Sequence, residues 1–221
     1  MININKIVKK IFPETLYIYL QNKKRLYGLP KQIKSIVRNL TSGDVCIDCG
    51  ANIGVYSQLF ASYGAKVYSF EPNPIAFNIL KNKAEKFKNI TPIMSAVGIS
   101  NTESNLYLHK DFHLDEVLYS QSSSLIKKKN NLSESSIRVD VINFSEWLEQ
   151  FDKIKFIKID IEGFEVELLN HLIDTKDLKN IDYIFVETHE KKIAELNVGI
   201  QQLRKKIEDL NLHTIIFWNW P

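Results

Sequence analysis

The chain has 221 residues, of which 44% are hydrophobic and 25% charged. These values match a soluble globular domain and exclude a disordered, collagen-like or disulfide-framed chain. A formal net charge of +3 is too balanced to indicate a nucleic-acid partner. No apolar run approaches the ~20 residues that cross a bilayer, and residues 1–10 lack a signal-peptide core. We therefore expect a cytoplasmic α/β domain with additional segments.

Residues 1–40 predict an N-terminal helical segment. Apolar residues recur at helical spacing among many lysines, as at Ile33, Ile36 and Val37. Pro13 and residues 28–30 are the expected breaks. A basic amphipathic segment of this kind could lie on an anionic membrane. The favoured interpretation is that it covers the edge of the main sheet.

Residues 41–221 predict a second, larger unit in which short β-rich apolar runs alternate with helical stretches. This alternation indicates an open, mostly parallel sheet with helices on both faces. Ligands of such sheets bind at the carboxyl ends of the strands, where the strand order reverses. The expected strands are 45–48, 66–70, 90–97, 156–161 and 183–187, and the expected helices are 55–62, 74–86 and 165–172.

The interval 100–136 interrupts this rhythm. It contains a hairpin strand at 103–109 and then a long polar stretch with serines at 122–124 and lysines at 127–129. A polar loop of this length is usually a lid, a substrate loop or disordered, and we predict a substrate loop. A strand at 137–142 and a short helix at 144–151, opened by Ser145, follow it.

The two cysteines, Cys46 and Cys49, form a Cys-x-x-Cys that could be a redox pair or half of a zinc site. They lie on the first predicted strand, where residues three apart point to opposite faces. The spacing therefore predicts two buried, inert thiols.

A glycine turn follows the first strand. Gly50 would let the backbone pass close to a ligand, and Gly54 would let the next helix pack closely on the strand. Glu71, followed by Pro72, ends the second strand about 20 residues downstream, where a carboxylate accepts hydrogen bonds from a ribose diol. Because the spacing is Gly-x-x-x-Gly, the cradle for a dinucleotide pyrophosphate is missing. The alternative is a tight turn beside a solvated glutamate.

Acidic residues and a histidine follow the fourth and fifth strands. Asp160 and Glu162 could orient a ligand amine, bind a divalent cation or hold a substrate hydroxyl. The alternative is that Glu162 caps the next helix while Asp160 is solvated. Glu187 and His189 end the fifth strand, and a histidine can accept a proton at neutral pH. His189 is therefore the candidate general base, although a lone histidine is more often a surface residue.

Together these segments resemble the FkbM family of S-adenosylmethionine-dependent methyltransferases. The motifs, in order over residues 43–190, are Asp-Cys-Gly-Ala-Asn-Ile-Gly at 48–54, Phe-Glu-Pro at 70–72, Ser-Ala-Val-Gly at 95–98, Lys-Ile-Asp-Ile-Glu-Gly-Phe-Glu at 158–165 and Glu-Thr-His at 187–189. The resemblance implies a Rossmann-like class I methyltransferase sheet. It also implies O-methylation of a hydroxyl, often on a sugar or polyketide, with S-adenosylmethionine as cofactor.

The resemblance also implies roles for single residues. Asp48, Gly50, Asn52 and Gly54 would border the methionine moiety of the cofactor, with Asp160 nearby. Glu71 with Pro72 would bind the ribose, and Ser95 with Ala96 the adenine. Ser123 and Ser124, in a serine-rich element before the fourth strand, would lie near the acceptor together with Glu162 and His189.

The sequence departs from the family pattern at its end. Such folds finish with two strands after the last helix, but only residues 212–218 follow the expected helix at 201–210. The final antiparallel strand is therefore expected to be absent. If Trp218 and Trp220 are exposed, they favour a contact such as a homo-oligomer through this edge. Alternatively, they cap the core.

Two mechanisms agree with these residues. In the first, His189 is the general base, while Asp160, Glu162 and Glu187 orient the cofactor or a small-molecule or glycan acceptor. In the second, a divalent cation held by Asp160, Glu162 and Glu187 or His189 acidifies the acceptor hydroxyl. The first is preferred, without a metal.

Other functions fit the sequence less well. A non-catalytic nucleoside-binding or scaffold protein of the same fold is the main alternative. An NAD(P)-dependent oxidoreductase is disfavoured because the second glycine of its fingerprint is missing. An N-methyltransferase is disfavoured because Asp160 begins Asp-Ile-Glu-Gly instead of an Asn/Asp-Pro-Pro-aromatic clamp.

Overall fold

The computed structural model describes residues 14–116, 123–125, 132–189, 196–218 and 220. Its main sheet has six parallel strands in the order β3-β2-β1-β7-β8-β9. They are β1 (Val45–Cys49), β2 (Lys66–Phe70), β3 (Ile90–Ile93), β7 (Phe156–Ile159), β8 (Ile184–Val186) and β9 (Ile216–Phe217). The predicted parallel α/β sheet is confirmed. In the described part of the chain, no antiparallel strand follows β9.

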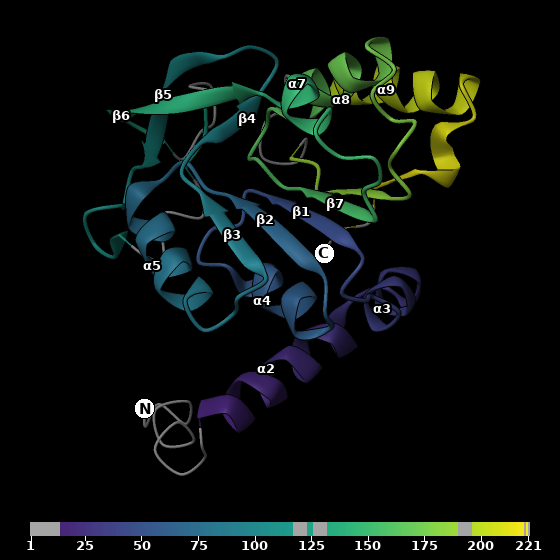
Figure 1. The fold of residues 1–221 in the computed structure, drawn as a ribbon. Coiled ribbons are helices and arrows are strands. Elements are labelled where there is room, and N and C mark those ends of the chain that lie inside the picture. Colours follow the sequence, from purple (N-terminus) through teal and green to yellow (C-terminus); the bar gives the residue numbers. More distant parts are fainter. Residues whose placement is uncertain (1–13, 117–122, 126–131, 190–195, 219, 221) are drawn as a thin grey trace.

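Helices cover both faces of this sheet (Figure 1). The helices are α2 (Glu14–Gly28), α3 (Lys31–Arg38), α4 (Val55–Ser62), α5 (Pro74–Ala84), α7 (Phe144–Leu148), α8 (Glu165–Asp174) and α9 (Leu196–Asp209), with a 3₁₀ turn η2 (Leu212–Thr214). Helices α4 and α5 lie on one side, and α7, α8 and α9 lie on the other, while α2 projects from the body (Figure 1). Two apolar clusters, one on each face, form the core. None of the described helices is both long and apolar enough to span a bilayer.

The strand order reverses between β1 and β7. From β1 the chain moves outward through β2 and β3, and from β7 it moves outward in the opposite direction through β8 and β9. Cys49 pairs with Phe70 on one side and with Ile159 on the other, so the residues that follow these strands meet at one edge. Such a switch point leaves a crevice between the diverging connections.

A second sheet of three strands, β4-β6-β5, lies beside the first. Its strands are β4 (Ala96–Gly98), β5 (Thr102–His109) and β6 (Leu132–Asn143). The prediction of one strand over 90–97 was wrong, because the chain leaves the main sheet at Met94 and joins the second sheet at Ala96. Ser95 fixes this crossing, since its hydroxyl donates to the Asp140 carbonyl at 2.9 Å.

The interval 100–136 is partly an antiparallel hairpin. Strands β5 and β6 pair from Thr102 with Val141 to His109 with Leu132, so the hairpin strand predicted at 103–109 is confirmed. Residues 122 and 127–129, included in the predicted substrate loop, lie outside the described residues. Ser145 does not open α7, because the Asn143 side chain accepts a hydrogen bond from the Glu146 N–H.

The cysteines are inert core residues, as predicted. Both are free and buried. Cys46 belongs to the apolar cluster beside α4, and Cys49 to the cluster beside α8, on the opposite face of the sheet. Burial raises the pKa of both thiols. Neither thiol can act as a nucleophile or a metal ligand in the folded protein.

The N-terminal helices pack on a face of the sheet and not on its edge. Helix α2 ends at Gly28 and α3 begins at Lys31, which confirms the predicted break at 28–30. Ile33 and Val37 of α3 join the cluster beside α4. Of the two alternatives stated for Trp220, exposure or burial in the core, the structure has the second, because Trp220 is 5% exposed and packs in this same cluster. It caps the core and gives no argument for an oligomer.

Candidate functional site

A cavity of about 380 Å³ opens at the switch point between β1 and β7. This volume lies within the range of small-molecule sites. Most of the residues predicted to bind cofactor or acceptor line it. These are Gly50, Asn52, Glu71, Pro72, Ser95, Ala96, Ser123, Asp160, Glu162 and Glu187. Four others do not line it: Asp48, Gly54, Ser124 and His189.

The glycine turn is built against the end of β7. Gly50 has a φ of +75°, and a Cβ there would lie 1.8 Å from the carbonyl oxygen of Asp160. Only glycine fits this position. The N–H groups of Gly50 and Ala51 both donate to the Phe70 carbonyl, at 3.1 and 2.8 Å. The turn is thus held between β2 and β7, and its next residue, Asn52, lines the cavity.

Gly54 packs against a helix and does not face the cavity. Its φ is +75°, and an added Cβ would lie 2.6 Å from Cδ1 of Leu80 on α5. This is the close helix packing that the sequence predicted for Gly54. Gly54 therefore supports the packing of the helices and does not line the cavity.

Glu71 points into the cavity next to the turn. Its carboxylate accepts hydrogen bonds from the N–H groups of Asn52 and Asn73, both at 2.8 Å. Burial raises the pKa of Glu71 to about 7, although these two N–H donors lower it. A carboxylate offers about four acceptor positions, so two remain for a ligand. Two donors on adjacent atoms, as in a ribose diol, match that capacity.

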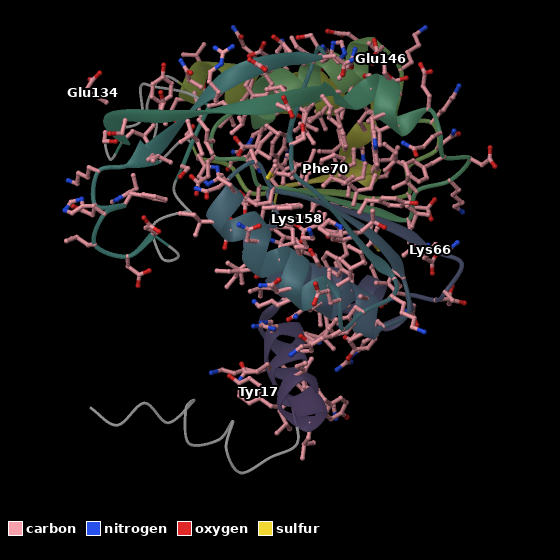
Figure 2. The ribbon with its side chains drawn as sticks, turned by 60° about the vertical axis from the view of Figure 1, so that its left-hand side comes forward. Tyr17, Lys66, Phe70, Glu134, Glu146 and Lys158 are labelled. Atoms are coloured by element: carbon pink, nitrogen blue, oxygen red, sulfur yellow. The ribbon has the colours of Figure 1, made fainter. Side chains whose placement is uncertain are left out.

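Lys158 lies beneath the cavity and joins the two central strands. It is 2% exposed, and its ammonium lies 3.2 Å from Asp48 and 3.2 Å from Asp160. Burial lowers the pKa of Lys158, but the two carboxylates outweigh this and raise it. Figure 2 shows Lys158 and Phe70 in the interior, whereas Lys66 lies at the periphery.

Asp48 is a partner of this lysine and not a wall of the cavity. It is fully buried and accepts a hydrogen bond from the Ser57 hydroxyl at 2.6 Å. Lys158 begins the motif at 158–165, but the sequence pattern alone predicts no role for it. Its position inside an apolar strand could have predicted a buried ion pair, because a buried lysine needs an acidic partner.

His189 is held by a carboxylate that sequence reasoning also left without a role. Its Nδ1 lies 2.9 Å from Oε1 of Glu165, and both side chains are almost completely buried. The same Oε1 accepts hydrogen bonds from the N–H groups of Ile161 and Gly163, each at 3.1 Å. Glu165, and not Glu162, therefore fixes the turn before α8, and the alternative role of Glu162 as a helix cap was wrong.

Three more carboxylates surround the other ring nitrogen of His189. Nε2 lies 3.3 Å from Glu162, 3.8 Å from Asp160 and 3.8 Å from Glu187. Among the described residues, Nε2 has no hydrogen-bond partner. Burial lowers the pKa of His189, but the hydrogen bond with Glu165 and the charges of the nearby acids outweigh this and raise it. His189 is 1% exposed and does not line the cavity.

The serines of the polar stretch divide between two roles. Ser124 is structural, since its hydroxyl donates to the Glu162 carbonyl at 2.7 Å and its backbone pairs with Tyr107. Ser123 lines the cavity, and its buried hydroxyl makes no hydrogen bond to any residue that the structure describes. An unsatisfied buried hydroxyl at a cavity wall is suited to a polar ligand.

Residues 48–212 match the sequence model of the methyltransferase FkbM domain. This match spans more than half of the chain and every element that forms the cavity. The chain belongs to the FkbM methyltransferase family. The segments 48–54, 70–72 and 158–165, which form the turn, the end of the second strand and the acidic rim described above, all lie within the matched range.

Two curated relatives support this assignment of the FkbM chain. The hexuronic acid methyltransferase AglP of Haloferax volcanii is 26% identical over 167 residues, which cover 74% of this chain and 64% of the relative. The methyltransferase sdnD of Sordaria araneosa is 24% identical over 185 residues, which cover 70% of each. The chain thus spans less than two thirds of the length of the first relative.

Solved structures overlap only loosely with this FkbM chain. The methyltransferase FkbM of Methylobacillus flagellatus has a TM-score of 0.41 at 20% identity, covering 63% of this chain and 31% of the other. The precorrin-6y C5,15-methyltransferase of Geobacter metallireducens has a TM-score of 0.38 at 12% identity, covering 91% and 73%.

Proposed function

We propose that this FkbM chain transfers a methyl group from S-adenosylmethionine to a hydroxyl of a sugar or similar polar acceptor. One observation carries the proposal. Glu71 has two acceptor positions left for a ligand. It lines the same cavity as the glycine turn that ends at Asn52, at the switch point of the sheet. A nucleoside with a free ribose diol and no pyrophosphate fits that combination.

The cofactor would lie along the carboxyl ends of β1 and β2. Glu71 would accept hydrogen bonds from the ribose hydroxyls, beside Pro72. Ser95 and Ala96, which begin the second sheet and line the same cavity, would contact the adenine. The methionine moiety would extend past Asn52 toward Asp160, whose carboxylate can bind its ammonium group.

The acceptor would bind where Ser123, Glu162 and Glu187 line the cavity. Methyl transfer asks the protein to align the reactants and remove one proton. The acceptor oxygen forms the new bond to the methyl carbon as the bond from that carbon to the sulfonium breaks, and the hydroxyl proton passes to Glu187. His189, 3.8 Å from Glu187, would position the acidic rim. This replaces its predicted role as the base.

A polar acceptor is favoured by the chemistry of this wall and by one relative. The wall offers carboxylates and an unsatisfied hydroxyl, which suit ligands rich in hydroxyl groups. AglP is named for methylation of a hexuronic acid. We therefore propose sugar acids and neutral sugars as the first acceptors to test.

The test is transfer of label from S-adenosylmethionine labelled in its methyl group. The full chain is incubated with uronic acids, neutral sugars and amines, and the products are separated and weighed by mass spectrometry. A labelled O-methyl sugar supports the proposal. Label found only on amines, or binding of NADH in place of S-adenosylmethionine in calorimetry, would refute it.

A matched pair of variants tests the proposed base. Glu187→Gln should reduce turnover by about 10²-fold or more with cofactor affinity unchanged. Glu167→Gln, which alters an exposed carboxylate on α8, should retain full turnover. Full turnover in Glu187→Gln would remove Glu187 from the role.

A further inference from the structure

We propose that Asp160, Glu162 and His189 form a binding site for a divalent cation at the edge of the cavity. One carboxylate oxygen of each acid and one ring nitrogen of His189 lie within 4.8 Å of one another. Oxygen ligands bind Mg²⁺ at about 2.1 Å, so opposite ligands stand about 4.2 Å apart. Adjacent ligands of an octahedral ion stand about 3.0 Å apart, and small movements of the two half-buried acids would bring all three atoms within these adjacent and opposite distances.

The orientation of His189 provides an independent observation. Its Nε2 is buried, lies 3.3 Å from Glu162 and 3.8 Å from Asp160, and has no hydrogen-bond partner in the part of the chain that the structure describes. The cost of burying an unpaired polar atom is normally avoided by giving it a partner. A cation bound by Nε2 together with the facing carboxylate oxygens would give this atom a partner.

Glu165 completes the arrangement from behind. A histidine that binds a metal through one nitrogen usually donates its other N–H to a carboxylate, which fixes the ring. His189 has this geometry, since Nδ1 lies 2.9 Å from Glu165. Glu165 is itself fixed by the N–H groups of Ile161 and Gly163. With Nδ1–H donated to Glu165, the lone pair of Nε2 faces the acidic rim.

The two acids are divided between the interior and the cavity. Lys158 lies 3.2 Å from Oδ2 of Asp160, while Oδ1 faces His189. Asp160 and Glu162 both line the cavity, with side chains 24% and 15% exposed. A cation between them could be reached from the cavity and would keep positions open toward it. This fits an acceptor that presents two neighbouring oxygens, such as a hydroxy acid or a diol.

The chemistry of the ligand set favours a hard or borderline dication. Two carboxylates with one imidazole suit Mn²⁺, Mg²⁺ or Zn²⁺ better than a soft metal. Cation binding does not depend on the proposed function, and only the use of the cation to hold an acceptor rests on it. The probe is therefore the metal alone.

The experiment titrates MnCl₂ into the full chain after treatment with EDTA, and measures free Mn²⁺ by electron paramagnetic resonance. One Mn²⁺ should bind per chain, and binding should broaden the ring proton signals of His189 in NMR spectra. Glu162→Gln should weaken binding at least about 10-fold, whereas Glu167→Gln on the surface of α8 should leave it unchanged. Thermal unfolding of both variants shows that they fold.

Each contrary result has one meaning. If the wild type binds no Mn²⁺ but binds S-adenosylmethionine, the cation site is refuted and the proposed function stands. If Glu162→Gln binds Mn²⁺ as well as the wild type, or if bound Mn²⁺ leaves the His189 signals sharp, the cation lies elsewhere and the proposal is refuted. If Mn²⁺ binds as expected but S-adenosylmethionine does not, the proposed function fails and the cation site stands.

Discussion

The affinity of the protein for S-adenosylmethionine should depend on the ionisation of Glu71. Burial raises the pKa of this carboxyl to about 7, against the lowering effects of two N–H donors and of Lys158. Asp48 adds to the rise. Only the carboxylate form accepts hydrogen bonds at both oxygens. Cofactor binding should therefore weaken as the pH falls through about 7 and Glu71 gains a proton.

The magnitude follows from that pKa of about 7. Between pH ~8 and pH ~6 the ionised fraction of Glu71 falls from about nine tenths to about one tenth. If only the ionised form binds the ribose diol, the dissociation constant rises about 10-fold over this interval. In Glu71→Gln one carboxylate oxygen becomes an amide N–H₂ that cannot accept, so one hydrogen bond to a charged group, worth about 1.5–3 kcal/mol, is lost, which weakens binding at pH ~8 by at least about 10-fold.

Isothermal titration calorimetry at the two pH values tests this reasoning. The amine of the ligand also titrates, but it does so equally with wild type and with Glu71→Gln. The variant should bind weakly at both pH values and lose most of the pH dependence. Equal pH dependence in the two proteins, or an affinity in the variant as high as in the wild type, would refute the role of Glu71.

Three further predictions concern the framework of the site. Gly54→Ala combines a φ of +75° with a contact of 2.6 Å, and should lower the free energy of unfolding in urea by about 2–4 kcal/mol. A matching loss in Gly43→Ala, where an added Cβ would make only an ordinary contact of 3.8 Å with Thr41, would contradict this cause. Lys158→Met leaves Asp48 buried without its cation and should destabilise by about 3–5 kcal/mol, and adding Asp48→Asn should restore part of the loss. Both cysteines should resist a thiol reagent until the protein is denatured, because burial raises the pKa of each thiol; fast labelling of the native protein would contradict their burial.

Local pattern was sufficient to predict the residues at the strand ends. The alternation of strand and helix defines a parallel sheet, and a parallel sheet brings Gly50, Glu71 and Asp160 to one edge whatever the details of packing. The spacing of Cys46 and Cys49 predicted that their side chains lie on opposite faces of β1, because the period of a strand is two residues. These features depend on short-range geometry alone.

Pairings between distant residues could not be predicted in this way. Lys158 meets the turn at Gly50, 108 residues earlier, and His189 meets Glu165 across 24 residues. A sequence pattern shows that an acid lies near a strand end, but not which of several acids takes the hydrogen bond. The strand predicted at 90–97 failed for a related reason, because an apolar run does not reveal that its second half joins another sheet.

The proposed function depends above all on Glu71, whose carboxylate should accept hydrogen bonds from the ribose of the cofactor beside the glycine turn. The most direct measurement is a crystal structure of the full chain with S-adenosylhomocysteine. Both ribose hydroxyls should lie within about 2.5–3.0 Å of the Glu71 carboxylate, the ordinary range for such hydrogen bonds. Ribose bound elsewhere, with Glu71 held only by the N–H groups of Asn52 and Asn73, would contradict it.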